Sequence, residues 1–281
     1  MPVQTLTIIG VGLIGGSIGL AAKTRGAARH IIGVGRDPRT LERAIADGMI
    51  DESTTELAKG VAEADLIIVC TPVDRVATDI LSTFTAAPKR SVITDAGSTK
   101  GNIVRALAGK LPTTAPAFIG SHPLAGSEKK GAAHARADLF DNRLVIVTPT
   151  AESDLEALGV VELFWQALGA RVIRMDPVEH DKALALTSHL PHAAASGLAA
   201  VTPLSMLGLT AGGFRDSTRI AAGDPDLWAA IFEANRDAVL AATDNFLERM
   251  TEFRRLLTTD DRAGLVRWLA EGKKVRDALG S

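Results

Sequence analysis

Hydrophobic and polar positions follow two different patterns along the chain, and the pattern changes near residue 175. Before that point, short runs of apolar and β-branched residues recur, each followed by a turn and a longer helical stretch. Buried strands that alternate with helices predict βαβ units and a parallel sheet. The expected strands are 5–9, 31–34, 66–70, 91–94, 117–119 and 144–147, and the clearest helices are 13–25 and 38–48.

Beyond about residue 175 the strand signal disappears and the segments become rich in alanine and leucine. Their periodicity predicts helices over 182–200, 227–257 and 261–279. We therefore expect an α/β Rossmann-type domain over residues 1–174 and an all-α domain over residues 175–281. A helical domain of this size often buries its apolar face against a second subunit, so we expect a homodimer. A monomer with a helical cap is the alternative.

The composition excludes several classes of protein. The net charge of −2 gives no basic surface for nucleic acid. No apolar run approaches the roughly 20 residues needed to span a bilayer, and the first residues lack a signal-peptide pattern. A single cysteine, Cys70, excludes an internal disulfide and argues against a thiolate metal site. We expect a cytoplasmic protein. The absence of tyrosine excludes a tyrosine general acid.

A glycine-rich segment, GVGLIG at residues 10–15, lies between the first strand and the first helix. In this context the pattern is typical of dinucleotide binding, because the glycines permit a tight turn and a close approach of backbone to pyrophosphate. The helix N-terminus then faces the phosphates. A glycine turn used only for packing is the alternative. The expected cofactor contacts are Gly10, Gly12, Leu13, Ile14 and Gly15.

The end of the second strand bears on the choice of cofactor. An acidic residue is expected there in NAD enzymes, but the chain has Gly35 followed by Arg36. A guanidinium suits a 2′-phosphate, which favours NADP, although Asp37 could still reach a ribose hydroxyl of NAD. Asp37 is also the expected N-cap of the second helix. Three residues at the end of the third strand are also expected to line the cofactor, with Cys70 mainly a buried apolar group: Cys70, Thr71 and Pro72.

His122 is the strongest candidate for a catalytic group. It follows an apolar strand and precedes a proline, which favours extended backbone at the strand end. A histidine there can accept a proton near neutral pH. The segment DAGSTK at 95–100 ends the preceding strand, and its Ser98 either caps a helix or contacts a substrate or histidine. Asp95 and Lys100 are spaced to pair with each other.

The helical half carries two further groups of polar residues. His189 and His192 flank a proline, and we expect a substrate contact or a polar pair at a helix start rather than a metal site. Arg219 is a candidate clamp for a substrate carboxylate, with an ion pair to Asp216 as the alternative. Trp228 is expected in the core.

Taken together, these residues resemble the prephenate/arogenate dehydrogenase family of tyrosine biosynthesis. The resemblance covers nearly the whole chain, and its motifs occur in the family's order. They are residues 10–17, 95–100, 122–126 with Glu128, 188–192, and 214–219 with Trp228.

The resemblance implies oxidative decarboxylation of a cyclohexadienyl substrate, with hydride transfer to NADP or NAD and no metal. His122 would accept the hydroxyl proton, and Ser98 would orient His122 and the hydroxyl. Arg219 would bind a substrate carboxylate and Glu128 would lie over the entrance. The remaining expected substrate contacts are His189, His192, Ser121, Gly212 and Asp216.

Some alternatives stay open at this point. Prephenate and arogenate differ by a keto and an amino group, which a few contacts decide. The Gly35-Arg36 pair resembles NADP-using members, many of which prefer arogenate. The segment between His192 and Gly212 is short for the family, and the sequence has no room for an appended regulatory domain. A β-hydroxyacid dehydrogenase, an imine reductase or a non-catalytic NADP-sensing protein are the competing functions.

Overall fold

The computed structural model describes residues 3–110, 116–126 and 131–280. By its internal contacts the chain divides into two compact units, residues 1–235 and 236–281. The domain boundary expected at residue 174 stays a prediction. None of the helices in the described ranges is both long and apolar enough to cross a membrane.

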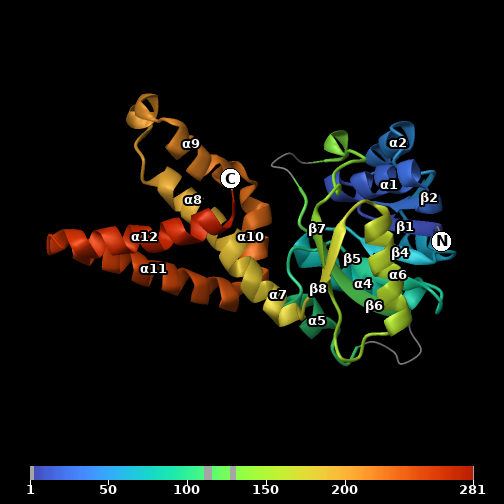
Figure 1. Ribbon diagram of the computed structural model, residues 1–281. Helices are drawn as coiled ribbons and strands as arrows, with labels where there is room; N and C mark the ends of the chain where they lie inside the picture. Colours follow the sequence, from blue (N-terminus) through green and yellow to red (C-terminus); the bar gives the residue numbers. More distant parts are fainter. Residues whose placement is uncertain (1–2, 111–115, 127–130, 281) are drawn as a thin grey trace. The chain divides into compact units, whose positions relative to one another are not determined.

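The first unit is built on a sheet whose described strands have the order β3-β2-β1-β4-β5-β6-β7-β8 (Figure 1). The strands β1 to β6 run parallel, as expected, but β7 pairs antiparallel with β6. The expectation of a wholly parallel sheet was therefore wrong for β7 and β8. The strands are β1 (Val3–Ile9), β2 (Ala28–Val34), β3 (Glu52–Thr54), β4 (Leu66–Val69), β5 (Val92–Asp95), β6 (Ala117–Pro123), β7 (Leu144–Thr148) and β8 (Arg171–Arg174).

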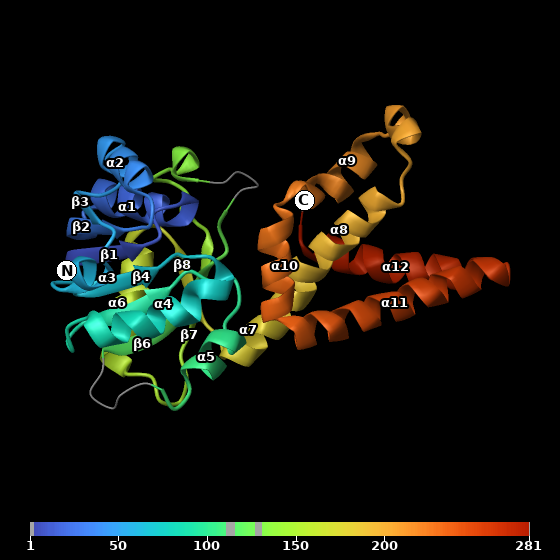
Figure 2. The same ribbon diagram turned by 180° about the vertical axis from the view of Figure 1, so that it is seen from behind.

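Helices cover both faces of this sheet (Figures 1 and 2). Side chains alternate along each strand, so Leu66 and Ile68 of β4 join one apolar cluster while Ile67 and Val69 join the other. The first cluster includes α1, α2 and α6, and the second includes α3, α4 and α5. These helices are α1 (Leu13–Arg25), α2 (Pro38–Ala46), α3 (Leu57–Val61), α4 (Val73–Ala86), α5 (Gly101–Leu107) and α6 (Leu155–Ala167).

The chain order of the strands reverses between β1 and β4. Ligands of such sheets bind in the crevice outside the carboxyl ends of the strands at this point. The fold therefore places the loops after β1, β2 and β4 where the sequence predicts the cofactor.

The remainder of the first unit is helical within the described residues, as expected after residue 175. A π-helical turn, η2, joins α7 to α8, which makes one nearly continuous helix of the segment that was expected over 182–200. The elements are η1 (Ala132–His134), α7 (Pro177–Leu184), η2 (Ala185–His189), α8 (Leu190–Ala200), η3 (Leu204–Leu209), α9 (Gly212–Thr218), η4 (Arg219–Ala222) and α10 (Pro225–Ala234).

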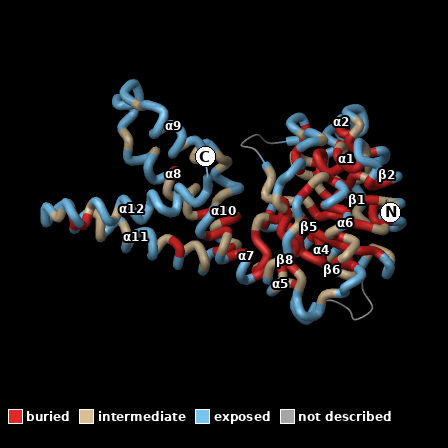
Figure 3. The backbone as a smooth tube through the Cα atoms, viewed as in Figure 1, coloured by how far each residue is buried: buried red, intermediate tan, exposed pale blue. Residues whose placement is uncertain are grey.

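The second unit is a pair of helices, α11 (Arg236–Thr258) and α12 (Arg262–Ala278). The rings of Phe253 and Trp268 pack at 5.1 Å, and Asp261 caps α12 by accepting from the amide of Gly264. Many apolar side chains of this unit stay exposed, in contrast to the buried sheet of the first unit (Figure 3).

Candidate active site

The glycine loop between β1 and α1 has the shape that a pyrophosphate needs. Gly10 has φ of +96°, and a Cβ there would lie 2.8 Å from the carbonyl oxygen of Cys70. A Cβ on Gly15 would lie 2.2 Å from the carbonyl oxygen of Gly10, so the helix packs against its own loop. Gly12 is the N-cap of α1, and a Cβ added there would meet open space. The amides that begin α1 have no side-chain cap, so this loop fits a phosphate group.

Residues at the ends of β2 and β4 flank this loop. Arg36 is exposed, whereas Asp37 uses both carboxylate oxygens locally: it accepts from the amide of Arg39 at 3.1 Å and from the hydroxyl of Thr40 at 2.7 Å. These two hydrogen bonds lower the pKa of Asp37 and confirm it as the N-cap of α2. Beyond β4, burial raises the pKa of the Cys70 thiol, and the buried hydroxyl oxygen of Thr71 has no hydrogen-bond partner within the described residues.

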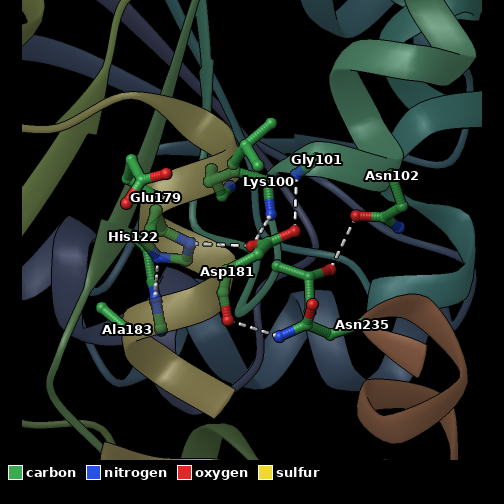
Figure 4. A network of polar contacts seen from close by, with 12 residues as sticks. Lys100, Gly101, Asn102, His122, Glu179, Asp181, Ala183 and Asn235 are labelled. Carbon is green, nitrogen blue, oxygen red and sulfur yellow. Dashed lines mark hydrogen bonds and ion pairs between the residues drawn. The ribbon is translucent and has the colours of Figure 1, made fainter. Parts of the chain in front are cut away.

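His122 lies in extended backbone near the end of β6, as expected, with 9% of its surface exposed. Its Nδ1 is 2.9 Å from Nε2 of His180, which is fully buried on α7. Nδ1 of His180 is in turn 2.8 Å from Oδ1 of Asp181. Figure 4 shows this polar network with His122, Asp181, Lys100 and Gly101 labelled. The catalytic candidate therefore belongs to a buried row of three side chains.

An ion pair lies beneath this row. Lys100 and Asp95 form the predicted pair, both are buried, and the Lys100 ammonium also donates to the carbonyl oxygen of Ser121 at 2.9 Å. The Ser121 hydroxyl is fully buried and contacts Thr94, the Asp95 carbonyl and the indole N–H of Trp165. The expected contact of Ser121 with substrate stays a prediction.

The electrostatics of the row keep His122 neutral. Burial lowers its pKa well below 6.5, and electrostatic interactions with His180, Lys100 and His189 lower it further. The pKa of Asp181 is lowered despite burial, because His180 and the backbone amides of Lys100 and Gly101 donate to its carboxylate. The arrangement is a neutral imidazole backed by an anion.

Ser98 does not cap α5, contrary to one of the two sequence expectations. The helix begins at Gly101, and its N-cap residue Lys100 makes no side-chain cap. Asp181 from α7 serves instead, by accepting from the amides of Lys100 and Gly101 at 2.8 and 2.7 Å. Ser98 itself is half-buried in the loop between β5 and α5, so its role toward His122 stays a prediction.

The predicted histidines of the helical segment lie on η2 and α8. His189 is buried, with its Nδ1 3.1 Å from the Asn235 amide nitrogen, and burial lowers its pKa to about 4. His192 stacks on Trp228 with ring centroids 3.4 Å apart, so the half-buried Trp228 is not the core residue that was expected. Burial lowers the pKa of His192, and the nearby charge of Arg219 lowers it further.

The other predicted substrate contacts have different surroundings. Arg219 begins η4 and is exposed, and it makes no ion pair with Asp216, although both residues are described. Gly212 and Asp216 are exposed on α9, and the structure joins neither to the His122 row. Glu128 lies outside the described residues.

Two residues next to His122 were missed by the sequence reasoning, His180 and Asp181. They form an adjacent, buried His-Asp pair in the middle of α7, just before residue 182, where the sequence predicted that a helix begins. Asn235, which donates to the Asp181 carbonyl at 2.8 Å, was missed for the same reason. A histidine followed by an acid at a helix start was the only signal in the sequence.

Comparisons with known proteins identify the family of this chain. The family model for the nucleotide-binding domain of prephenate dehydrogenase matches residues 18–174, and that for its dimerization domain matches 176–271. The prephenate dehydrogenase of Bacillus subtilis is 34% identical over 98% of this chain and 76% of its own length. The cyclohexadienyl dehydrogenase of Zymomonas mobilis is 34% identical over 98% of this chain and 95% of its own.

Solved structures give the same result. The prephenate dehydrogenase from A. aeolicus, in complex with hydroxyphenyl propionate and NAD+, has a TM-score of 0.90 and 31% identity over 99% of both chains. The arogenate dehydrogenase of Synechocystis has a TM-score of 0.83 and 27% identity over 98% of this chain and 100% of that one. With both domain models matched in order, the chain belongs to the prephenate dehydrogenase family.

Proposed function

We propose that the protein catalyses the oxidative decarboxylation of a cyclohexadienyl substrate, prephenate or arogenate. One observation carries the proposal: within this family's fold, a buried neutral histidine, His122, lies at the carboxyl end of β6 on the edge of the sheet that carries the glycine loop. Bound NAD(P)+ supplies a hydride acceptor. Relatives with the printed names prephenate, cyclohexadienyl and arogenate dehydrogenase support this class of substrate.

In the proposed reaction, His122 accepts the proton of the ring hydroxyl while hydride leaves the ring carbon that bears this hydroxyl. The carbon–carbon bond to the ring carboxylate then breaks, carbon dioxide departs, and its electron pair makes the ring aromatic. His122 returns its proton to the resulting phenolate oxygen. Ser98 is proposed to orient the hydroxyl. Arg219, exposed and next to His192, is proposed to bind a carboxylate of the substrate.

We further propose that NADP is the preferred cofactor. Each oxygen of Asp37 already accepts a local hydrogen bond, from the amide of Arg39 and from the hydroxyl of Thr40, while the exposed Arg36 is available for a 2′-phosphate. The A. aeolicus relative was solved with NAD+, so the preference of this chain requires a direct test. The glycine loop serves either cofactor, because both carry the same pyrophosphate.

The deciding experiment measures reduced nicotinamide formation by the purified protein at 340 nm. Prephenate and arogenate are each tested with NAD+ and with NADP+. We expect turnover, with NADP+ giving the higher kcat/KM for the preferred substrate. A folded protein that binds cofactor and is inactive in all four combinations would contradict the proposal and favour a reductase or a sensor.

A further inference from the structure

The side chains of His122, His180 and Asp181 form a buried, hydrogen-bonded row. All three side chains are buried, with exposures of 9%, 0% and 6%. Each neighbouring pair is within hydrogen-bond distance, at 2.9 Å and 2.8 Å. A buried row of this kind has few allowed arrangements of protons, because every nitrogen and oxygen in it needs a partner.

The direction of the hydrogen bonds along the row, from donor to acceptor, is fixed at its Asp181 end. The amides of Lys100 and Gly101 donate to this carboxylate, and a backbone N–H can only donate. Both carboxylate oxygens are therefore acceptors, which agrees with the lowered pKa of Asp181. His180 must then donate through Nδ1, and a neutral imidazole that donates through Nδ1 carries its lone pair on Nε2.

The same rule applies one step further along the row. Since Nε2 of His180 accepts, Nδ1 of His122 must carry the proton and donate. We propose that His180 and Asp181 are positioning residues that hold His122 in its Nδ1–H tautomer, so that Nε2 is the atom that accepts the substrate's hydroxyl proton. The proposal rests on the proposed role of His122 as the base.

The row also stabilises the product of proton transfer. When Nε2 of His122 takes the hydroxyl proton, the positive charge lies one imidazole away from the Asp181 carboxylate. The other titratable groups that face His122 are Lys100, whose positive charge opposes this protonation and which pairs with Asp95, and His189, whose pKa of about 4 leaves it neutral near pH 7. Asp181 thus supplies the compensating negative charge on the α7 side of the ring, as the acid of a catalytic triad does.

The tautomer can be observed without turnover. In protein labelled with ¹⁵N-histidine, long-range ¹H–¹⁵N spectra separate protonated from unprotonated ring nitrogens, and the spectrum of His122→Asn assigns the His122 signals among the six histidines. We expect a protonated Nδ1 and an unprotonated Nε2 at neutral pH. A protonated Nε2 on His122 would overturn the proposal, and this measurement needs only the wild-type fold.

Two substitutions of His180 separate positioning from packing. Glutamine presents an oxygen that can accept from His122 and an amide that can donate to Asp181, whereas leucine fills the space without either. We expect His180→Leu to lower kcat about ten- to hundredfold with little change in KM, because His122 then populates the wrong tautomer. His180→Gln should recover most of the loss, and His30→Gln, an exposed histidine on β2, should change neither constant.

The outcomes distinguish this proposal from the one on which it rests. Full turnover by His122→Asn would contradict the proposed role of His122 as the base, whatever its tautomer. An inactive His122→Asn together with wild-type kcat in His180→Leu would leave the base in place and overturn the row. Equal losses in His180→Leu and His180→Gln, with an unchanged His122 tautomer in both, would also overturn it.

Discussion

The charge state of His122 determines the pH range in which the proposed reaction proceeds. Burial lowers the pKa of His122 well below 6.5, and electrostatic interactions with His180, Lys100 and His189 lower it further. The neutral form is the one that accepts a proton. The neutral form dominates above the lowered pKa. We therefore expect kcat/KM to stay on its plateau through pH 6.5 and to fall only under more acidic conditions.

The measurement is a profile of kcat/KM over about pH 5 to 9 with the preferred substrate pair. An acid limb centred at or above 6.5 would contradict the expectation. In His122→Asn, the whole profile should fall by about 10²- to 10⁴-fold, which is the range of general-base contributions. Cofactor binding, followed by fluorescence titration, should be unchanged in that variant.

Arg36 gives a second prediction at this scale. Removal of its guanidinium in Arg36→Ala should raise KM for NADP+ about ten- to hundredfold, since a hydrogen bond between charged groups contributes about 1.5–3 kcal/mol. KM for NAD+ should stay within about twofold, because NAD+ lacks the 2′-phosphate. Arg29→Ala, at an exposed arginine nearer the start of β2, is the matched control. Equal effects on both cofactors would contradict an NADP-specific role.

Among the elements, the turn from β1 into α1 contains two glycines with different expected roles. Gly15 is expected to matter for stability and Gly12 for cofactor binding. A Cβ on Gly15 would collide with the carbonyl oxygen of Gly10, whereas a Cβ on Gly12 would meet open space where the proposed cofactor lies. We expect Gly15→Ala to lower the thermal unfolding temperature. Gly12→Ala should unfold like the wild type but bind NADP+ at least about tenfold more weakly, because backbone approach to the pyrophosphate is blocked.

Thermal unfolding with and without NADP+ measures both effects. Bound ligand stabilises the native state by mass action, so the wild type should show a clear upward shift of the unfolding temperature and Gly12→Ala a reduced one. A wild-type shift in Gly12→Ala would contradict the placement of the pyrophosphate at this loop.

Periodicity located most of the elements but not their direction. The helix 13–25 matches α1, and Asp37 caps α2, because these signals are local in sequence. Strand direction is not local: the apolar run of β7 is the same whether it pairs parallel or antiparallel, so its reversal could not be predicted. The strands β3 (EST) and β8 (RVIR) contain no buried residue, so neither shows the apolar run by which the other strands were predicted.

In the candidate site, too, the sequence predicted local features but not contacts between distant residues. The glycine loop and His122 carry chemistry that a short segment shows by itself. Asp181 caps α5 across 80 residues of sequence, and no local pattern indicates such a pairing. No local pattern indicated the contacts of the Ser121 hydroxyl with Thr94, the Asp95 carbonyl and Trp165, and its expected contact with substrate stays a prediction.

At the scale of the whole molecule, the exposed apolar residues of the second unit favour association of two copies of the chain. The pair α11 and α12 buries little of its apolar surface: Leu240, Leu247 and Leu269 are 56%, 55% and 58% exposed. Large exposed apolar patches mark interaction sites, and this segment lies largely within the match to the family's dimerization domain. We propose a homodimer in which a second copy covers this surface, with a mass twice the 29.4 kDa of one chain.

Sedimentation velocity tests this proposal. Leu240 and Leu247 are seven residues apart, two turns along one face of α11, so the double variant L240E/L247E places two charges in any interface formed there. We expect the wild type to sediment as a dimer and the variant to shift to monomer, because burying unpaired carboxylates is costly. Glu248→Gln, at an exposed polar position of the same helix, should remain dimeric. A monomeric wild type would contradict the homodimer, and a dimeric L240E/L247E would move the interface to another surface.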